Sequence, residues 1–152
     1  MIIAIGCDHG GIALKDTVIS AVNDKGYQYI DFGTYDNASV DYPDYAEKVA
    51  KAILEGKADK GILLCGTGIG ISIAANKFRG IRCAHVTDKF SARMCVEHNN
   101  ANIIALGARI TTSEDAYDII AKYLSSVFDP TSGRHVARIE KITSIENQTL
   151  KN

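Results

Sequence analysis

The sequence lacks an excess of charge of either sign. Its 17 lysine and arginine residues are balanced by 18 aspartate and glutamate residues, which gives a formal net charge of -1 at pH 7. A nearly neutral chain offers no basic surface of the kind that binds nucleic acid or an anionic membrane. We therefore expect no nucleic-acid partner and no membrane partner.

Long apolar runs are also missing, since no stretch approaches the roughly 20 residues that are needed to span a bilayer. The first residues, Met1-Ile2-Ile3-Ala4-Ile5-Gly6, lack the basic segment and the cleavage pattern of a secretory signal. They are better interpreted as a first strand. Four cysteines without such a signal predict reduced thiols in a cytoplasmic protein rather than a disulfide framework.

Proline is scarce, with two residues, and the chain is 46% hydrophobic and 23% charged. This composition is that of an ordinary soluble globular protein. A length of 152 residues is enough for one domain with a proper core, so we expect a single domain over residues 1–152. We find no internal repeat and no linker.

Cysteine and histidine lack the spacing of the common structural zinc sites. Cys83-x-His85 and Cys95-x-x-His98 together offer four ligands, but neither pair has the C-x₂-C or H-x₃-H spacing of such sites. We expect no metal site.

Strand and helix patterns alternate from end to end, which predicts a parallel sheet with helices on both faces. The expected strands are residues 2–6, 27–31, 61–64, 82–86 and 103–106. The expected helices are residues 10–25, 43–54, 69–78, 88–98, 112–127 and 135–148. The predicted fold class is α/β, a doubly wound, Rossmann-like three-layer α/β/α sandwich with a five-stranded parallel sheet. The last helix has an apolar stripe, and it either covers its own sheet or packs on a partner subunit.

One stretch, residues 60–77, joins a buried strand to a cysteine and a glycine turn. Gly61 to Leu64 have no polar alternation, Cys65 follows, and Gly66-Thr67-Gly68-Ile69-Gly70 lead into helical spacing. A strand that turns through glycines into a helix presents free backbone N–H groups and the positive end of the helix dipole at one point, which suits an anion. A cysteine at this point is placed where its thiolate is stabilised. We interpret the stretch as a catalytic turn.

Other glycine motifs fail on spacing. A dinucleotide fingerprint, G-x-G-x-x-G, that begins with Gly66 and Gly68 needs its third glycine at position 71, which is occupied by Ile71. A P-loop needs Lys-Ser/Thr after its last glycine, whereas Gly70 is followed by Ile71-Ser72. The plainer alternative is a tight turn with a buried structural cysteine, and three alternating glycines beside a cysteine and a threonine count against it.

Ligands of a doubly wound sheet bind outside the carboxyl ends of the strands. The residues directly after the expected strands include a carboxylate, an imidazole, a thiol, a hydroxyl and a guanidinium. They lie in segments 7–9, 31–33, 65–67, 87–88 and 107–109. To these we add His98-Asn99 at the end of the fourth helix. Arg134 and Arg138, one helical turn apart, can chelate one phosphate, although such a pair is usually a solvated face.

With these residues assembled, the chain closely resembles the type B ribose-5-phosphate isomerases of the ribose/galactose isomerase family. The matching segments are GCDHGG at 6–11, DYP at 41–43, ILLCGTGIGISIAANKFRGIR at 62–82, EHNNAN at 97–102, LGAR at 106–109, and GRH at 133–135 with the later Arg138. They cover nearly the whole chain. The resemblance implies a homodimer or dimer of dimers whose active site lies between subunits and uses residues of both. It implies no metal and no organic cofactor.

The resemblance also implies roles for individual residues. Cys65 is the general base that moves a proton between carbons one and two, His98 opens the furanose ring, and Asp8 and Thr67 complete the catalytic set. The residues expected to bind the sugar phosphate are Asp8, His9, Tyr42, Gly66, Thr67, Gly68, Ile69, Gly70, Asn99, Arg109, Arg134 and Arg138. The expected reaction is the interconversion of ribose 5-phosphate and ribulose 5-phosphate in the pentose phosphate pathway.

The chemistry fits these residue types. Aldose–ketose isomerisation removes a weakly acidic proton next to a carbonyl and leaves negative charge on an enediolate oxygen. A free cysteine has a pKa of about 8.5, which a helix N-terminus lowers towards neutrality, and this matches a general base to the working pH. The amides of residues 66–70 then act as an anion hole, where losing one comparable donor typically costs about 3 kcal/mol of barrier. Thr67 moves protons between the two substrate oxygens.

Two other functions stay open. One is an isomerase of a six-carbon sugar phosphate, such as galactose 6-phosphate or allose 6-phosphate, with the same fold and chemistry. The other is a non-catalytic nucleotide- or ligand-binding module on a flavodoxin-like sheet, against which the missing fingerprints, Cys65 and His98 count.

Overall fold

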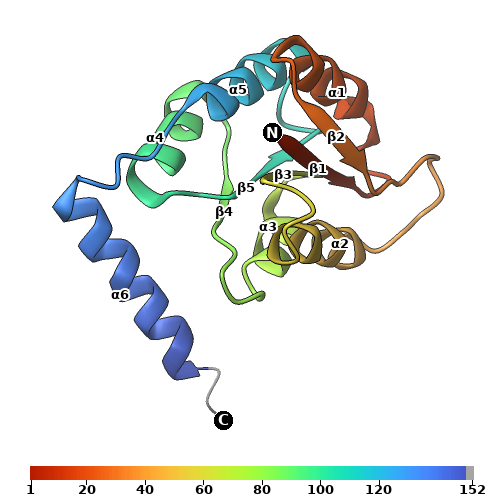
Figure 1. Cartoon of the computed structure of the whole chain (residues 1–152). Coiled ribbons are helices and arrows are strands. Elements are labelled where there is room, and N and C mark those ends of the chain that lie inside the picture. The colour runs from red at the N-terminus through yellow and green to blue at the C-terminus, as the bar shows by residue number, and fades with distance from the viewer. Residues whose placement is uncertain (150–152) are drawn as a thin grey trace.

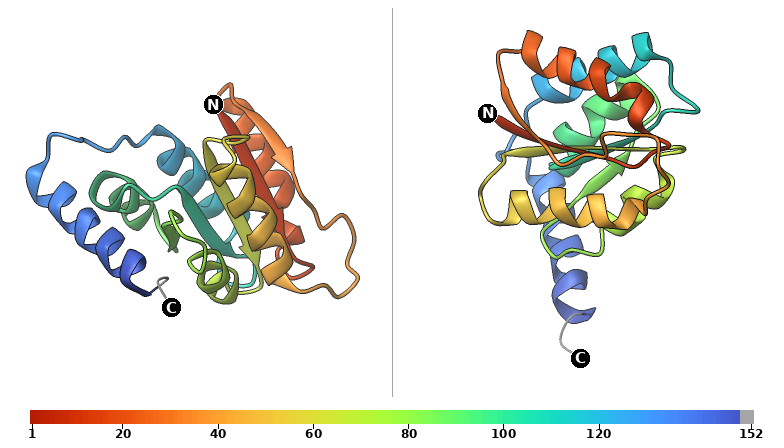
Figure 2. Two further views of the ribbon diagram at one scale, coloured as in Figure 1. Left: turned by 60° about the horizontal axis from the view of Figure 1, so that its bottom comes forward. Right: turned by 90° about the vertical axis from the view of Figure 1, so that its right-hand side faces the viewer.

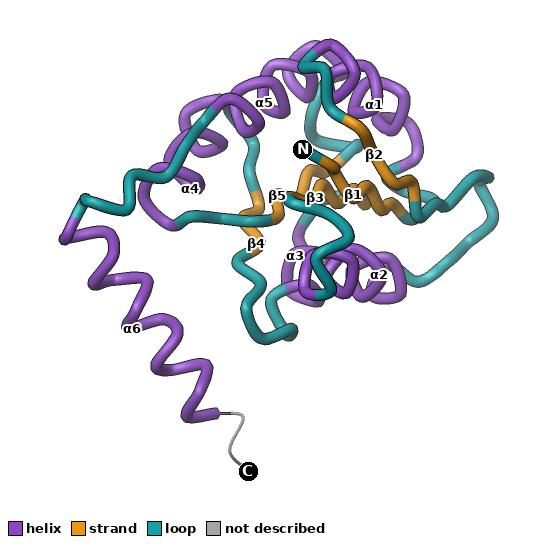
Figure 3. The backbone as a smooth tube through the Cα atoms, viewed as in Figure 1, coloured by secondary structure: helices purple, strands orange, loops and turns teal. Residues whose placement is uncertain are grey.

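Strands and helices alternate along the chain, as the sequence predicts (Figures 1 and 3). The computed structural model describes residues 1–149. The strands are β1 (Ile2–Cys7), β2 (Gln28–Asp31), β3 (Lys60–Cys65), β4 (Cys83–His85) and β5 (Ile103–Gly107). The helices are η1 (Ile12–Leu14, a 3-10 turn), α1 (Lys15–Asp24), α2 (Tyr42–Leu54), α3 (Ile69–Ala75), α4 (Lys89–Asn99), α5 (Ser113–Ser125) and α6 (Gly133–Thr149).

The five strands form one parallel sheet in the order β2-β1-β3-β5-β4. Figure 2 shows three layers, with α1, α4 and α5 on one face of the sheet and α2 and α3 on the other. After β1 the chain forms β2 on one side of the sheet, and after β3 it forms β4 and β5 on the other side. The neighbours β1 and β3 therefore flank the switch point, where the connections diverge and ligands bind in sheets of this kind.

Burial along the strands follows from this sandwich. The five residues of β5 and the last five residues of β1 and of β3 are buried, because helices cover both faces of the central strands. The edge strands β2 and β4 contain no buried residue. No helix of residues 1–149 is long and apolar enough to cross a membrane.

The first helix begins later than the sequence predicts. A helix from Gly10 was expected, but residues 8–11 form a turn in which the N–H of Gly11 bonds to the carboxylate of Asp8 at 3.0 Å. This turn lies directly on β3, since a β-carbon on Gly11 would approach the carbonyl oxygen of Leu64 to 2.5 Å. Tight backbone packing therefore replaces the first helical turn.

The helix after the glycine turn is shorter than predicted. It ends at Ala75 rather than near Phe78. Beyond its end, the side chain of Asn76 exchanges two hydrogen bonds with the backbone of Cys83, at 2.8 and 2.9 Å. These bonds tie the end of α3 to the beginning of β4.

The last helix does not cover the sheet. α6 packs beside α4 and extends away from the body of the molecule (Figure 1), and none of its residues is buried. Its apolar stripe is open to solvent in this single chain, with Ile142 45% and Ile145 61% exposed. Both residues line a groove of about 580 Å³ between α6 and the segment around Asn76 to Ala84.

Candidate active site

The three central strands end in chemically active segments at one edge of the sheet. β1 ends at Cys7 and is followed by Asp8 and His9, while β3 ends at Cys65 and β5 ends at Gly107. Cys65 pairs with Gly107 in the parallel ladder, and Cys7 pairs with Leu64. The segments after these strands therefore lie side by side at the switch point.

The turn after β3 directs a backbone amide towards the Cys65 thiol. The N–H of Gly68 donates a hydrogen bond to Sγ of Cys65 at 3.1 Å. Gly68 is the N-cap of α3 and has a φ of 77°, a left-handed conformation that glycine adopts without steric cost. The amides of the first helical turn have no partner inside the helix, and that of Ile69 bonds to the Thr67 hydroxyl at 3.3 Å. The thiol therefore lies beside a backbone donor at the start of α3, an arrangement that favours a negative charge at this point.

Close packing holds this turn in place. A β-carbon on Gly107 would lie 2.4 Å from the carbonyl carbon of Thr67, so the turn rests directly on the backbone of β5. A β-carbon on Gly68 would lie 2.7 Å from the ring of His85, at the end of β4. The positions of the amides are therefore set by close packing against the backbone of β5 and the ring of His85.

Two side chains flank the turn. A β-carbon on Gly66 would lie 3.2 Å from Cζ of Arg109, which places the guanidinium against this glycine. A β-carbon on Gly70 would lie 2.7 Å from Cζ of Tyr42, which places the phenol against the other end of the turn. Arg109 is exposed and Tyr42 is 39% exposed, so both are accessible to a ligand.

The segment after β1 supplies the carboxylate and the imidazole. Asp8 is buried, and its Oδ1 accepts the N–H of Gly11 at 3.0 Å. His9 is half-buried, and its Nδ1 accepts the N–H of Val40 at 3.2 Å. The structure thus brings eight of the predicted positions to the carboxyl ends of the central strands or to the glycine turn beside them, and these are Asp8, His9, Tyr42, Gly66, Thr67, Gly68, Gly70 and Arg109. Ile69 belongs to the same turn, with its side chain exposed.

The other predicted residues form a second group on α4 and α6. The rings of His98 and His135 stack with their centroids 4.2 Å apart and an angle of 13° between their planes. Desolvation, and then the charges of His98, Arg134 and Arg138, lowers the pKa of His135. Asn99, the last residue of α4, lines the groove beside α6. This group carries positive charge and is largely exposed.

The second group lies at the opposite ends of the strands. α4 follows β4, and its last residues, His98 and Asn99, lie shortly before the first residue of β5, at the amino ends of the strands. Cys65 lies beside Gly107, the last residue of β5. The five residues of β5 separate its amino end from its carboxyl end by roughly 13 Å. One chain therefore does not bring His98 and Asn99 to the Cys65 thiol.

The other three thiols lie in different surroundings. Burial raises the pKa of Cys7 and of Cys95 to about 11, and burial followed by the nearby Cys95 raises the pKa of Cys83 to about 12. The thiol of Cys95 donates to the carbonyl of Ala92 at 3.2 Å. Among residues 1–149, no group of three or more His, Cys, Asp or Glu side chains is arranged to hold a metal ion.

Three neighbours of the predicted residues had little or no sequence signal. The Val40 amide lies in a polar loop, and His85 ends a short edge strand, so neither belongs to a recognisable motif. His135 belongs to the GRH segment at 133–135, but nothing in the sequence indicated that its ring stacks on that of His98. The contacts of all three depend on how distant segments pack.

A doubly wound α/β protein with a thiol and a backbone donor at its switch point is the class that this fold and geometry define. Residues 3–142 match the family model described as Ribose/Galactose Isomerase. Ribose-5-phosphate isomerase B of Escherichia coli is 44% identical over 146 residues, which cover 96% of this chain and 97% of that protein.

Solved structures agree with this match. Ribose-5-phosphate isomerase B of Clostridium thermocellum has a TM-score of 0.94 and 50% identity, covering 98% of this chain and 99% of that one. The Mycoplasma genitalium enzyme, solved with bound ribulose-5-phosphate, has a TM-score of 0.89 and 36% identity, covering 96% of each chain. The chain belongs to the ribose/galactose isomerase family and, within it, to the type B ribose-5-phosphate isomerases.

Proposed function

We propose that the chain interconverts ribose 5-phosphate and ribulose 5-phosphate, with Cys65 as the general base. The observation that carries this proposal is the thiol of Cys65 beside the N–H of Gly68, at the start of α3. The Mycoplasma genitalium relative, solved with ribulose-5-phosphate, supports a sugar phosphate as the ligand.

The substrate reacts as the open-chain aldose, with its carbonyl at C1 and a hydrogen on C2. The thiolate of Cys65 removes the C2 proton, which leaves an enediolate with its negative charge on O1 near the amides of residues 66–70. These preorganised donors stabilise the charge as it forms. Thr67 passes the proton of O2 to O1, and Cys65 returns its proton to C1, which yields the ketose carbonyl at C2. The reaction is redox-neutral within one molecule, so it consumes no external oxidant or reductant.

We further propose that a second copy of the chain completes the site with its His98, Asn99, Arg134 and Arg138. The distance between the two edges of the sheet supports this, because the two groups do not meet within one chain. The exposed apolar stripe of α6 supports a homodimer, or a dimer of dimers, in which the two copies bury that stripe.

The second group has the chemistry that a furanose phosphate requires. His98 would donate a proton to the ring oxygen, and its stacking on His135 would hold the imidazole in one orientation. Arg134 and Arg138 are exposed and one turn apart on α6, which suits bidentate contacts with a phosphate. Arg109 and His9 would contact the substrate from the thiol side.

A catalytic free thiol needs a reducing compartment, and we therefore place the enzyme in the cytoplasm.

Turnover tests the proposal. We expect the highest kcat/KM with ribose 5-phosphate, compared with allose 6-phosphate and galactose 6-phosphate. A higher kcat/KM with either six-carbon sugar would overturn the assignment of the substrate. Thermal stabilisation by nucleotides without turnover of any sugar phosphate would instead favour a binding module.

A further inference from the structure

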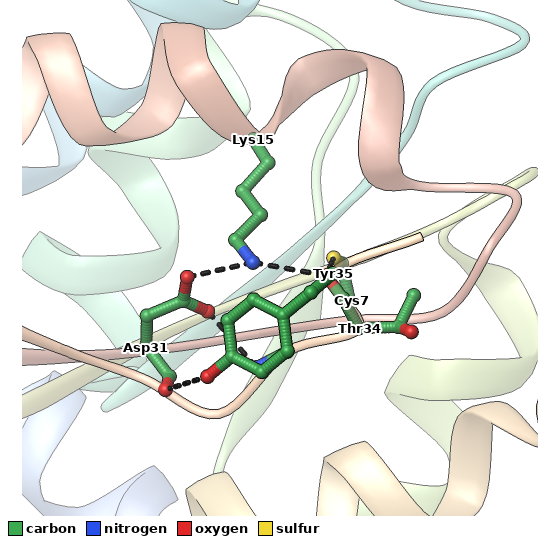
Figure 4. Close-up of polar contacts among 6 residues, drawn as sticks. Cys7, Lys15, Asp31, Thr34 and Tyr35 are labelled. Carbon is green, nitrogen blue, oxygen red and sulfur yellow. Dashed lines mark hydrogen bonds and ion pairs between the residues drawn. The ribbon is translucent and has the colours of Figure 1, made fainter. Parts of the chain in front are cut away.

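Lys15, the first residue of α1, has its ammonium group in the interior. Only 7% of the residue is exposed. Its Nζ lies 2.6 Å from Oδ2 of Asp31 and donates to the carbonyl oxygen of Thr34 at 2.9 Å (Figure 4). It also lies 4.1 Å from the centre of the Tyr35 ring. A carboxylate, a carbonyl and a ring face thus satisfy a group that is costly to bury.

A buried ion pair is weak evidence for stability, because a well-packed apolar pair of the same volume is often as stable or more stable. What such a pair provides is a defined geometry, since removing one partner leaves an uncompensated charge. The geometry that Lys15 defines is that of residues 33–41. This segment joins the edge strand β2 to α2, and residues 35–39 are exposed.

The near end of this segment is attached to β1 and α1. Cys7 and the Gly33–Thr34 pair exchange two backbone hydrogen bonds of 2.6 Å, and Lys15 binds the Thr34 carbonyl. Asp31 continues the attachment, because its other carboxylate oxygen accepts the N–H of Gly33 at 2.9 Å. The Tyr35 hydroxyl in turn donates to the Asp31 carbonyl at 2.8 Å.

The far end of the segment touches the candidate active site. The N–H of Val40 donates to Nδ1 of His9 at 3.2 Å, and two residues later Tyr42 places its phenol against Gly70. A backbone N–H only donates, so Nδ1 of His9 must be the acceptor. In the neutral ring the proton is then on Nε2, which is left as a hydrogen-bond donor. A donor of this kind suits a phosphate or hydroxyl oxygen.

We propose that Lys15 is a positioning residue for the substrate site: through Asp31 and Thr34 it sets the segment 33–41, which holds His9 in its Nε2–H tautomer and fixes Tyr42. The proposal rests on the isomerase function for its kinetic part. It assigns Lys15 no contact with substrate.

The decisive comparison is between Lys15→Met and the double variant Lys15→Met/Asp31→Asn. The single variant leaves the Asp31 carboxylate without its cation. The double variant removes both charges, and the asparagine oxygen still accepts the N–H of Gly33. Lys89→Met, which removes an exposed lysine paired with Asp118, is the matched control. If Lys15 positions the segment, KM for ribose 5-phosphate rises about tenfold in both Lys15 variants while kcat changes less, and the control behaves as wild type.

Stability separates positioning from mere structural support. The double variant is expected to regain much of the thermal stability that the single variant loses, without regaining KM. Recovery of both together, or an unchanged KM in both variants, would overturn the proposal.

A second measurement needs no substrate. Long-range ¹H–¹⁵N spectra of ¹⁵N-histidine protein report the tautomer of each ring, and a His9→Gln sample assigns the His9 signals. Wild type is expected to show the Nε2–H tautomer, and the double variant a mixture. An unchanged Nε2–H tautomer in the double variant contradicts the proposal. If wild type fails to turn over ribose 5-phosphate, the proposed function fails, while this spectrum still tests the role of Lys15.

Discussion

The N–H of Gly68 donates a hydrogen bond to Sγ of Cys65 at 3.1 Å, which joins the proposed base and the anion-stabilising turn in one contact. Cys65→Ala is expected to lower isomerisation at least about a thousandfold, since a general base contributes up to about 10⁴-fold. Binding of sugar phosphate should survive, because the amides and guanidinium remain. Deuterium incorporation at C2, followed by NMR, measures the proton transfer itself. Near-wild-type incorporation in the variant would remove Cys65 from the base role.

Gly107 is expected to tolerate no side chain, because a β-carbon there would lie 2.4 Å from the backbone of Thr67. Gly107→Ala should lower the free energy of unfolding by about 3 kcal/mol or more, since the backbone cannot yield as a side chain does. Gly133→Ala is the matched control, because nothing lies within 4 Å of its β-carbon position. Urea unfolding of both variants checks the prediction, and equal stabilities would show that the turn does not rest on β5.

Alkaline pH is expected to destabilise the protein through Cys83. Its pKa is raised from 9.0 to about 12 by burial and then by Cys95, so above pH 9 the unfolded chain releases the proton first. The contribution of the protonated Cys83 thiol to the free energy of unfolding is complete below pH 9. It is lost as the pH rises towards 12, at roughly 1.4 kcal/mol per pH unit. Urea unfolding between pH 8 and about 11, under reducing conditions, should show a steeper loss in wild type than in Cys83→Ala. Identical slopes would contradict the prediction.

His98→Asn is expected to harm ring-forming substrates more than open-chain ones. Ribose 5-phosphate closes to a furanose, whereas a tetrose 4-phosphate cannot, because its O4 carries the phosphate. The loss of kcat/KM should be about a hundredfold for the first substrate and much smaller for the second, since only the first needs a proton donor for ring opening. Parallel assays with ribose 5-phosphate and erythrose 4-phosphate decide the point. Equal losses on both would argue that His98 acts elsewhere in the reaction.

Mixed subunits test whether the site is shared. Cys65→Ala and Arg138→Ala proteins should each be nearly inactive. After subunit exchange at equal amounts, half of the dimers are mixed and each has one intact site, so about a quarter of wild-type activity should return. Size-exclusion chromatography shows whether each variant remains a dimer. If exchange is demonstrated by native mass spectrometry and no activity returns, Cys65 and Arg138 serve a site within one chain.

Local sequence patterns were sufficient for much of the fold. The buried strand from Gly61 to Leu64 was recognisable because neither of its faces meets water. The glycine turn was recognisable from the alternating glycines at positions 66, 68 and 70, and the structure requires glycine at position 68, where φ is 77° and a β-carbon would lie 2.7 Å from the ring of His85. The family resemblance was visible in the same segments. Element ends were less predictable, as the late start of α1 after Gly11 shows, because tertiary contacts with β3 decide them.

The sequence by itself determined the residue types of the site, the α/β alternation and the family. The tertiary structure decided which of those residues meet. Crossover geometry explains why α4 returns His98 to the amino ends of the strands. The stacking of His98 on His135, however, depends on the path of the chain after α5. The burial of Lys15 against Asp31 likewise depends on the packing of α1 over β2. Such contacts join segments whose local patterns carry no information about each other, because hydrophobic periodicity specifies which face is buried and not which polar group lies opposite.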